Sequence, residues 1–244
     1  DEWDQPQEDE FKNFRMETLY DAMLDVCDML GGVTCLEATA GGLPAQVAAC
    51  HADADKWREV EGTLFFVRAT ARYIPKTEAA IVPSVLSLGP QLPGHWRVRV
   101  AFTVLVGKLG RWLDDNPAML GGLLEFIVQG LGMPKVGRAS AEALQDLCNS
   151  CAGHLASPER LQGLLGIYRN MGGLQMSEQE KIVEGLGSVL CRVPTDQLMP
   201  MIAAAAEPPM ETLQAAVQRG AKADVIQSLK KLRMLIKGGV TAAE

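Results

Sequence analysis

The 244-residue sequence has few aromatic side chains, since Phe, Trp and Tyr together make up 5% of it. Leu, Ala, Gly and Met are frequent instead, and this composition favours helices that pack on helices. Apolar residues form 48% of the chain and charged residues 22%, which is typical of a folded protein and not of a disordered one. A chain of this length buries a sizeable core.

The sequence also lacks a long apolar run. No stretch reaches the roughly 18–20 residues of a membrane-spanning helix, and no secretory signal peptide is apparent. The net charge of −7 argues against a general nucleic-acid-binding protein, which needs a basic face. We therefore expect neither membrane nor direct nucleic-acid binding. The charge is uneven, because residues 1–10 hold six acids and no base, whereas residues 219–237 hold six bases and one acid.

Motifs that carry catalysis are missing as well. G-x-S-x-G, H-E-x-x-H and P-loop spacings do not occur, and the glycine pairs do not follow strands. His51 and His95 lie near expected helix ends, among polar residues. A lone histidine in such a position is usually a solvated or capping residue. We predict a protein that is not an enzyme and needs no cofactor.

No segment shows the alternation of a β-strand, whereas the helical period runs through nearly the whole chain. Helix starts are marked by Asn116-Pro117, Ser157-Pro158 and a capping box from Ser177 to Glu180. The predicted helices cover residues 10–30, 33–50, 56–74, 77–88, 95–115, 117–132, 136–155, 158–172, 178–192, 195–206, 209–219 and 222–237.

Long and short helices alternate, and the pairs recur at about 40 residues, the spacing of HEAT-type repeats. Trp57-Arg58 aligns with Trp96-Arg97 one repeat later. We predict an all-α fold, an α-solenoid of about five to six HEAT-type antiparallel helix pairs. The expected organisation is an acidic disordered lead (1–8), a single solenoid segment (9–237) and a disordered tail (238–244). The expected units are 9–50, 56–88, 95–132, 136–172 and 178–219, with a last helix at 222–237.

Cys148 and Cys151 form a C-x-x-C spacing followed by His154. This spacing allows two interpretations: a metal or redox site, and small apolar residues in a helix core. The three residues share one helix, no second Cys/His pair lies nearby, and no strand precedes the motif. The cysteines align with Val106 and Leu109 of the previous repeat, which favours core packing and no metal site. Six cysteines in a chain of this length do not form a disulfide scaffold and fit free thiols.

The candidate partner-binding residues are charged side chains on the short helices and on the last, basic helix. They are Glu125, Arg160, Arg169, Lys230, Lys231 and Arg233. Each alone is more often a solvated charge, and the basic helix lacks aromatics that would stack on RNA bases. The expected structural core includes Trp57, Trp96, Leu105, Leu147, Cys148, Cys151 and Leu186.

Four stretches carry a family resemblance: "ADKWREVEGTLFFVRATARYI", "VRVAFTVLVGKLGRWLDDNPAML", "ALQDLCNSCAGHLA" and "GLGSVLCRVPTDQL". In this order they resemble the middle HEAT repeats of the transportin-SR receptors in the importin-β superfamily. The resemblance implies a nuclear import receptor that shuttles between cytoplasm and nucleus. Its implied partners are serine/arginine-rich protein cargo and, through the full-length receptor, the Ran GTPase and nucleoporins, with RanGTP releasing the cargo.

The chain starts with Asp1 and holds only five or six repeats, so we expect a fragment of a longer receptor or an incomplete gene model. No contact residue of the family transfers to a position of this sequence. Two alternatives stay open: a HEAT scaffold for another protein complex and, more remotely, a metal or redox protein built on the C-x-x-C helix.

Overall fold

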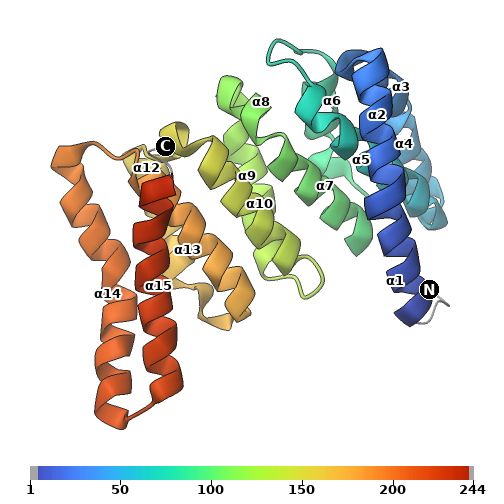
Figure 1. Ribbon diagram of the computed structural model, residues 1–244. Helices are drawn as coiled ribbons and strands as arrows, with labels where there is room; N and C mark the ends of the chain where they lie inside the picture. Colours follow the sequence, from blue (N-terminus) through green and yellow to red (C-terminus); the bar gives the residue numbers. More distant parts are fainter. Residues whose placement is uncertain (1–4, 242–244) are drawn as a thin grey trace. The chain divides into compact units, whose positions relative to one another are not determined.

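The computed structural model describes residues 5–241 (Figure 1). These residues are almost entirely helical and include no strand. The predicted all-α, helical-repeat solenoid fold is thereby confirmed. The chain divides into two compact units, one ending at Trp112 and one starting at Leu113. No helix in the described part of the chain is both long and apolar enough to cross a membrane.

The first unit is built around a single central helix. The central helix α5 (Trp57–Thr70) packs against α2, α3, α4 and α7. Its inward face buries Val60, Leu64 and Val67 completely or nearly so, at the spacing of one face of a helix. The other helices are α1 (Gln5–Asn13), α2 (Tyr20–Leu30), α3 (Gly32–Ala40), α4 (Leu43–Ala52), α6 (Ile81–Ser87), α7 (Trp96–Lys108) and α8 (Gly110–Asp115), the last of which crosses the division between the units.

The second unit stacks its long helices in series. Helix α10 (Gly137–Ser150) packs on α13 (Met176–Leu190), and α13 packs in turn on α15 (Lys222–Thr241). The shorter helices are α9 (Leu120–Leu131), α11 (Ala152–Leu155) and α12 (Pro158–Arg169). Helix α14 (Thr195–Arg219) lies alongside α15 (Figure 1). Gly220, with φ +66°, makes the turn between them, because glycine adopts the left-handed conformation without a Cβ clash.

The contact between α10 and α13 shows the repeat directly in side-chain pairs. Gln145 Nε2 donates to Glu184 Oε2 at 2.6 Å, and the two residues are 39 positions apart. Ser188 Oγ donates to Asn149 Oδ1 at 2.7 Å, again across 39 positions. Cys148 lies between these pairs and faces Gly185, where an added Cβ would come within 3.0 Å of the cysteine Cβ. Equivalent helices of neighbouring repeats therefore lie in direct contact, as in a solenoid.

Several predicted helix boundaries differ from the structure. The predicted helix 33–50 is two helices, separated at Gly41-Gly42. The predicted helices 195–206 and 209–219 are one helix, α14, that continues through Pro208 and Pro209. Each proline removes a backbone N–H donor, but Ala205, Pro209 and Ala216 are buried on one side of α14, so packing keeps the helix continuous.

Two predicted helix starts are also corrected. The capping box belongs to Gln175 and Glu178 and not to Ser177 and Glu180, so α13 begins at Met176. The predicted helix 77–88 begins only at Ile81, because the Glu78 carboxylate accepts the N–H groups of Ala80, Ile81 and Val82 at 2.7–2.9 Å. A side-chain acceptor of this kind replaces the missing helical carbonyls.

The two terminal segments are longer helices than expected. Residues 5–8 of the expected disordered lead belong to α1, and α15 extends to Thr241, into the expected tail. The expectations for residues 1–4 and 242–244 lie outside the described residues.

We expect Gly32→Ala to destabilise the first unit by about 1–3 kcal/mol. A Cβ on Gly32 would overlap the backbone carbonyl of Tyr73, which cannot rotate away as a flexible side chain could. Urea unfolding followed by tryptophan fluorescence measures this, since all four tryptophans lie within residues 1–112.

Gly62→Ala is the matched control, because Gly62 lies inside α5 and a Cβ there meets nothing within 4 Å. It should stabilise the same unit by roughly 0.5–1 kcal/mol through helix propensity. Equal effects of the two substitutions would contradict the close approach at Gly32.

We expect Glu78→Ala to cost about 1 kcal/mol at neutral pH by removing the N-terminal cap of α6. Burial opposes ionisation of Glu78, but its three backbone N–H donors outweigh burial and hold its pKa below the ordinary value of 4.5. The stabilisation is therefore present above the unfolded-state pKa and is lost as the pH falls through the lower folded-state pKa.

The free energy of unfolding of wild type and Glu78→Ala, compared from about pH 7 to about pH 3, should converge at the acid end. Glu37→Ala, at an exposed position of α3, is the control and should differ little from wild type. A Glu78→Ala deficit that persists at low pH would show that the carboxylate is not the cap.

Candidate functional site

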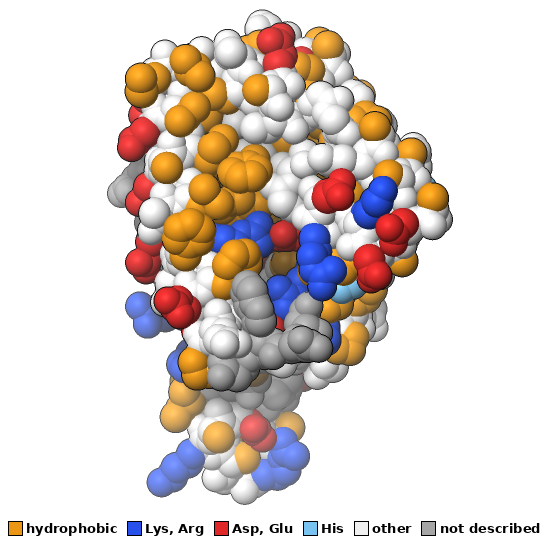
Figure 2. Space-filling view, turned by 90° about the vertical axis from the view of Figure 1, so that its right-hand side faces the viewer, with side chains coloured by type: hydrophobic (Ala, Val, Ile, Leu, Met, Phe, Trp, Pro, Cys, Tyr) orange, Lys and Arg blue, Asp and Glu red, His pale blue; other side chains and the backbone are white. Residues whose placement is uncertain are grey.

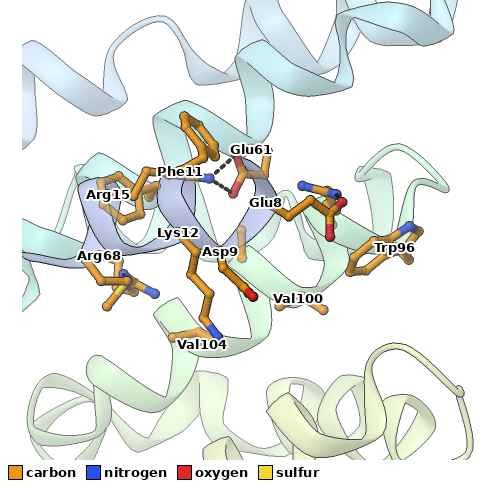
Figure 3. A pocket seen from close by; sticks show the side chains of 14 residues that line it. Glu8, Asp9, Phe11, Lys12, Arg15, Glu61, Arg68, Trp96, Val100 and Val104 are labelled. Carbon is orange, nitrogen blue, oxygen red and sulfur yellow. Dashed lines mark hydrogen bonds and ion pairs between the residues drawn. The ribbon is translucent and has the colours of Figure 1, made fainter. Parts of the chain in front are cut away.

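The candidate site is a groove in the first unit that runs between α1 with its following π-helical turn (Phe14–Leu19), α5 and α7. It consists of two adjoining hollows of about 350 Å³ and about 710 Å³ that share several lining residues. Basic, acidic and apolar side chains gather together on the molecular face shown in Figure 2. Figure 3 shows the side chains around the smaller hollow.

Arg15 holds the segment after α1 against α5. Its Nη1 donates to both carboxylate oxygens of Glu61, at 2.9 and 3.1 Å (Figure 3). Its guanidinium also lies 4.2 Å from the ring centroid of Phe65. Both charged side chains are only 18% exposed, so the pair is better shielded from solvent than an ordinary surface ion pair. Arg15 therefore forms the closed floor of the groove.

Arg97 and the aromatic residues around it form the opposite end of the groove. Arg97 Nη2 donates to Glu8 Oε1 at 3.1 Å, across 89 positions. Its guanidinium lies 5.1 Å from the Trp96 ring and 6.0 Å from the Trp57 ring. The His95 ring stacks on Trp57 with centroids 3.8 Å apart. Arginine over indole is a favourable cation–π arrangement.

Arg58 and Arg68 extend the positive charge along α5. Arg58 is exposed and lies 4.7 Å from the Trp57 ring. Arg68 lies 4.9 Å from Phe65, and its Nη2 donates to Met16 Sδ at 3.1 Å. Burial lowers the pKa of Arg68. The groove thus combines arginines, aromatic rings and three carboxylates, which suits recognition of a polypeptide segment.

Sequence reasoning did not select these arginines as partner-binding residues. One signal was present: Trp57-Arg58 and Trp96-Arg97 recur one repeat apart. The expected core residues Trp57 and Trp96 are half-buried at the rim of this groove and not in the core. The other expected core residues, Leu105, Leu147, Cys148, Cys151 and Leu186, are each at most 2% exposed.

The structure does not gather the predicted partner-binding residues into one cluster. Glu125 is exposed on α9. Arg160 Nη1 donates to the His154 carbonyl at 3.2 Å, which ties α12 to α11. Arg169 lies 4.0 Å from Glu207 of α14. On α15, Lys230 and Arg233 are exposed, whereas Lys231 is half-buried.

The C-x-x-C pair lies in the interior of the second unit. Burial raises the pKa of Cys148 to about 12 and that of Cys151 to about 12. His154 points elsewhere, with Nε2 2.8 Å from the Asp114 carbonyl oxygen. Among residues 5–241, no group of three or more His, Cys, Asp or Glu is arranged to hold a metal ion. Protonated, buried thiols are poor nucleophiles.

Comparisons with known proteins show similarity to nuclear transport receptors. The model described as the Transportin-3/Importin-13 third TPR domain matches residues 78–167. Transportin MOS14 of Arabidopsis thaliana is 29% identical over 77% of this chain and 20% of its own length. The mRNA transport regulator MTR10 of Saccharomyces cerevisiae is 25% identical over 77% of this chain and 19% of its length. Importin-13 of Homo sapiens is 21% identical over 87% of this chain and 22% of its length.

The chain is therefore similar to a segment of transportins and importin-13. It spans about a fifth of the length of these relatives. The family model is named for tetratricopeptide repeats, which are also helix pairs but have a period of about 34 residues. The side-chain pairs 39 positions apart between α10 and α13 fit the longer HEAT spacing.

We expect only Cys191 to react quickly with Ellman's reagent in the folded protein at about pH 8. Cys191 is exposed, whereas the other five cysteines are buried. The high pKa values of Cys148 and Cys151 keep their thiols protonated until the pH approaches those values. Absorbance at the reagent's product band counts the reactive thiols.

The variant Cys191→Ser should lose the fast reaction and keep the slow one that follows unfolding in urea. Fast labelling that remains in Cys191→Ser would contradict the burial of the C-x-x-C pair.

Proposed function

We propose that this chain forms part of a nuclear transport receptor that binds protein cargo and shuttles between cytoplasm and nucleus without catalysing a reaction. The observation that carries the proposal is the match to a transportin over 77% of the chain, together with helix-pair packing at the HEAT spacing. Importins and transportins are named for transport, and a helical-repeat surface suits the binding of long partners.

We propose further that RanGTP controls cargo release and that the cargo is of the serine/arginine-rich type. The resemblance of the four stretches to transportin-SR repeats supports this finer assignment. Nucleoporins are the remaining expected partners, bound by the full-length receptor. The groove at α1, α5 and α7 is the proposed cargo contact of the first unit, because arginines backed by aromatic rings bind acidic or phosphorylated segments well.

A pull-down tests the proposal with RanGTP, RanGDP and a phosphorylated serine/arginine-repeat peptide. The longest natural chain that contains this segment is compared with the 244-residue piece. We expect the long chain to bind the peptide and to release it with RanGTP. Failure of the long chain to bind either Ran form or the peptide would favour a HEAT scaffold for another complex.

Arg58→Ala tests the groove, since Arg58 is exposed and lies over the Trp57 ring. In the long chain, it should weaken peptide binding about fivefold or more, as expected when a contact arginine is removed. Arg138→Ala removes the same charge from an 83% exposed side chain of α10 and should leave affinity unchanged. Equal affinities of the two variants would remove the groove from the proposal without affecting the transport function.

A further inference from the structure

The second unit contains a smaller cavity of about 210 Å³, enclosed by α12, η6 (Met171–Gly173), α13, α14 and α15. Tyr168, Gln179, Thr212, Ser228 and Lys231 are among the polar residues that line it. Three of them are almost completely buried, because Tyr168 and Ser228 are 2% exposed and Gln179 is 6% exposed. A cavity with so many hydrogen-bonding groups and a lysine differs from the apolar gaps of helix packing.

Tyr168 lines this cavity and carries an unpaired hydroxyl. Its Oη is buried and has no hydrogen-bond partner among the described residues. Burial raises the pKa of Tyr168 to about 12, so the hydroxyl keeps its proton and can donate. Buried polar groups in native proteins are nearly always paired, and an unpaired hydroxyl beside a cavity therefore points to a group that binds there.

Lys231 supplies the positive charge. Its Nζ donates to Gln179 Oε1 at 2.7 Å, and Gln179 Nε2 donates to the Leu174 carbonyl at 2.8 Å, which fixes the amide orientation. An ammonium group has three N–H donors, so two remain for another acceptor. Burial lowers the pKa of Lys231, as expected for a cation that has lost water and has not gained an anion.

The neighbouring carboxylates are engaged with other cations. Asp224, which also lines the cavity, lies 3.6 Å from Arg219. Glu207 lies 4.0 Å from Arg169. Within residues 6–236, where side chains are described, Gln179 is the recorded partner of the Lys231 ammonium, and no carboxylate lies within ion-pair distance of it.

We propose that this cavity binds a single carboxylate, presented by an Asp or Glu side chain of an acidic partner protein. The Lys231 ammonium and the Tyr168 hydroxyl donate to its two oxygens, and the charge of Lys231 is neutralised. A carboxylate suits the site better than a phosphate dianion, because Arg169, the other cation that lines the cavity, already pairs with Glu207, and Lys231 alone cannot balance two charges beside Asp224. The inference does not depend on the transport function, since it rests on the second unit alone.

The test uses the 244-residue chain and an acetylated, amidated Gly-Glu-Gly peptide, with binding followed by NMR titration. The matched Gly-Gln-Gly peptide keeps the shape and removes the charge. We expect the Glu peptide to bind at least about tenfold more tightly, as a charge-assisted hydrogen bond requires. Equal binding of the two peptides, or tighter binding of inorganic phosphate than of the Glu peptide, would overturn the proposal.

Three variants locate the binding. Lys231→Gln should weaken the Glu peptide about tenfold or more, and Tyr168→Phe, which keeps the ring and removes only the hydroxyl, about three- to tenfold. Lys230→Gln is the control, because Lys230 is the adjacent exposed lysine of α15 and is not among the residues that line the cavity.

Loss of binding in Lys230→Gln equal to that in Lys231→Gln would show general surface attraction and overturn the site. Unchanged binding in Tyr168→Phe, with higher stability to urea, would show that the hydroxyl is only an unsatisfied group, and it would also overturn the proposal. Far-UV circular dichroism of each variant establishes that the helices are intact before affinities are compared.

Discussion

The structure depends on one constraint: a helix pair of this type cannot bury its apolar face alone and must pack against the next pair. Helix α13 shows this most clearly, since it contacts α10 on one side and α15 on the other. Gly185 and Cys148 are small at the point where α10 and α13 approach closest to one another, and polar pairs on either side set the register. These small residues therefore allow the neighbouring helices α10 and α13 to pack closely.

This constraint also explains the C-x-x-C motif. A Cβ added at Gly185 would lie only 3.0 Å from Cys148 Cβ and 3.3 Å from its Sγ, and in this close contact the cysteine serves as a compact apolar side chain. The same close packing excludes solvent and keeps the thiol protonated. A protonated thiol is a poor nucleophile, so the geometry favours core packing as the role of this motif.

The arginine groove has a different physical basis, because two of its arginines are paired with carboxylates within the fold. Arg15 forms an ion pair with Glu61, and Arg97 forms one with Glu8. Aromatic rings lie against the guanidinium groups of both arginines. Such a surface holds its side chains in fixed positions before a partner arrives, which lowers the entropy lost on binding. An acidic segment would have to compete with the carboxylates already present, and that competition favours selectivity over affinity.

The helical period, the repeat spacing near 40 residues and the place of Cys148 and Cys151 in the core were predictable from the sequence, because periodicity and alignment between repeats report which residues share a helix face. Helix ends were less predictable. The start of α6 depends on the Glu78 carboxylate, which accepts the backbone N–H groups there, and the continuity of α14 depends on its buried face.

Pairings such as Arg97 with Glu8 and Lys231 with Gln179 join residues 89 and 52 positions apart. Only the tertiary structure decided these contacts and the cavities around them, since they form where helices distant in sequence pack together and no local pattern records which side chains will meet.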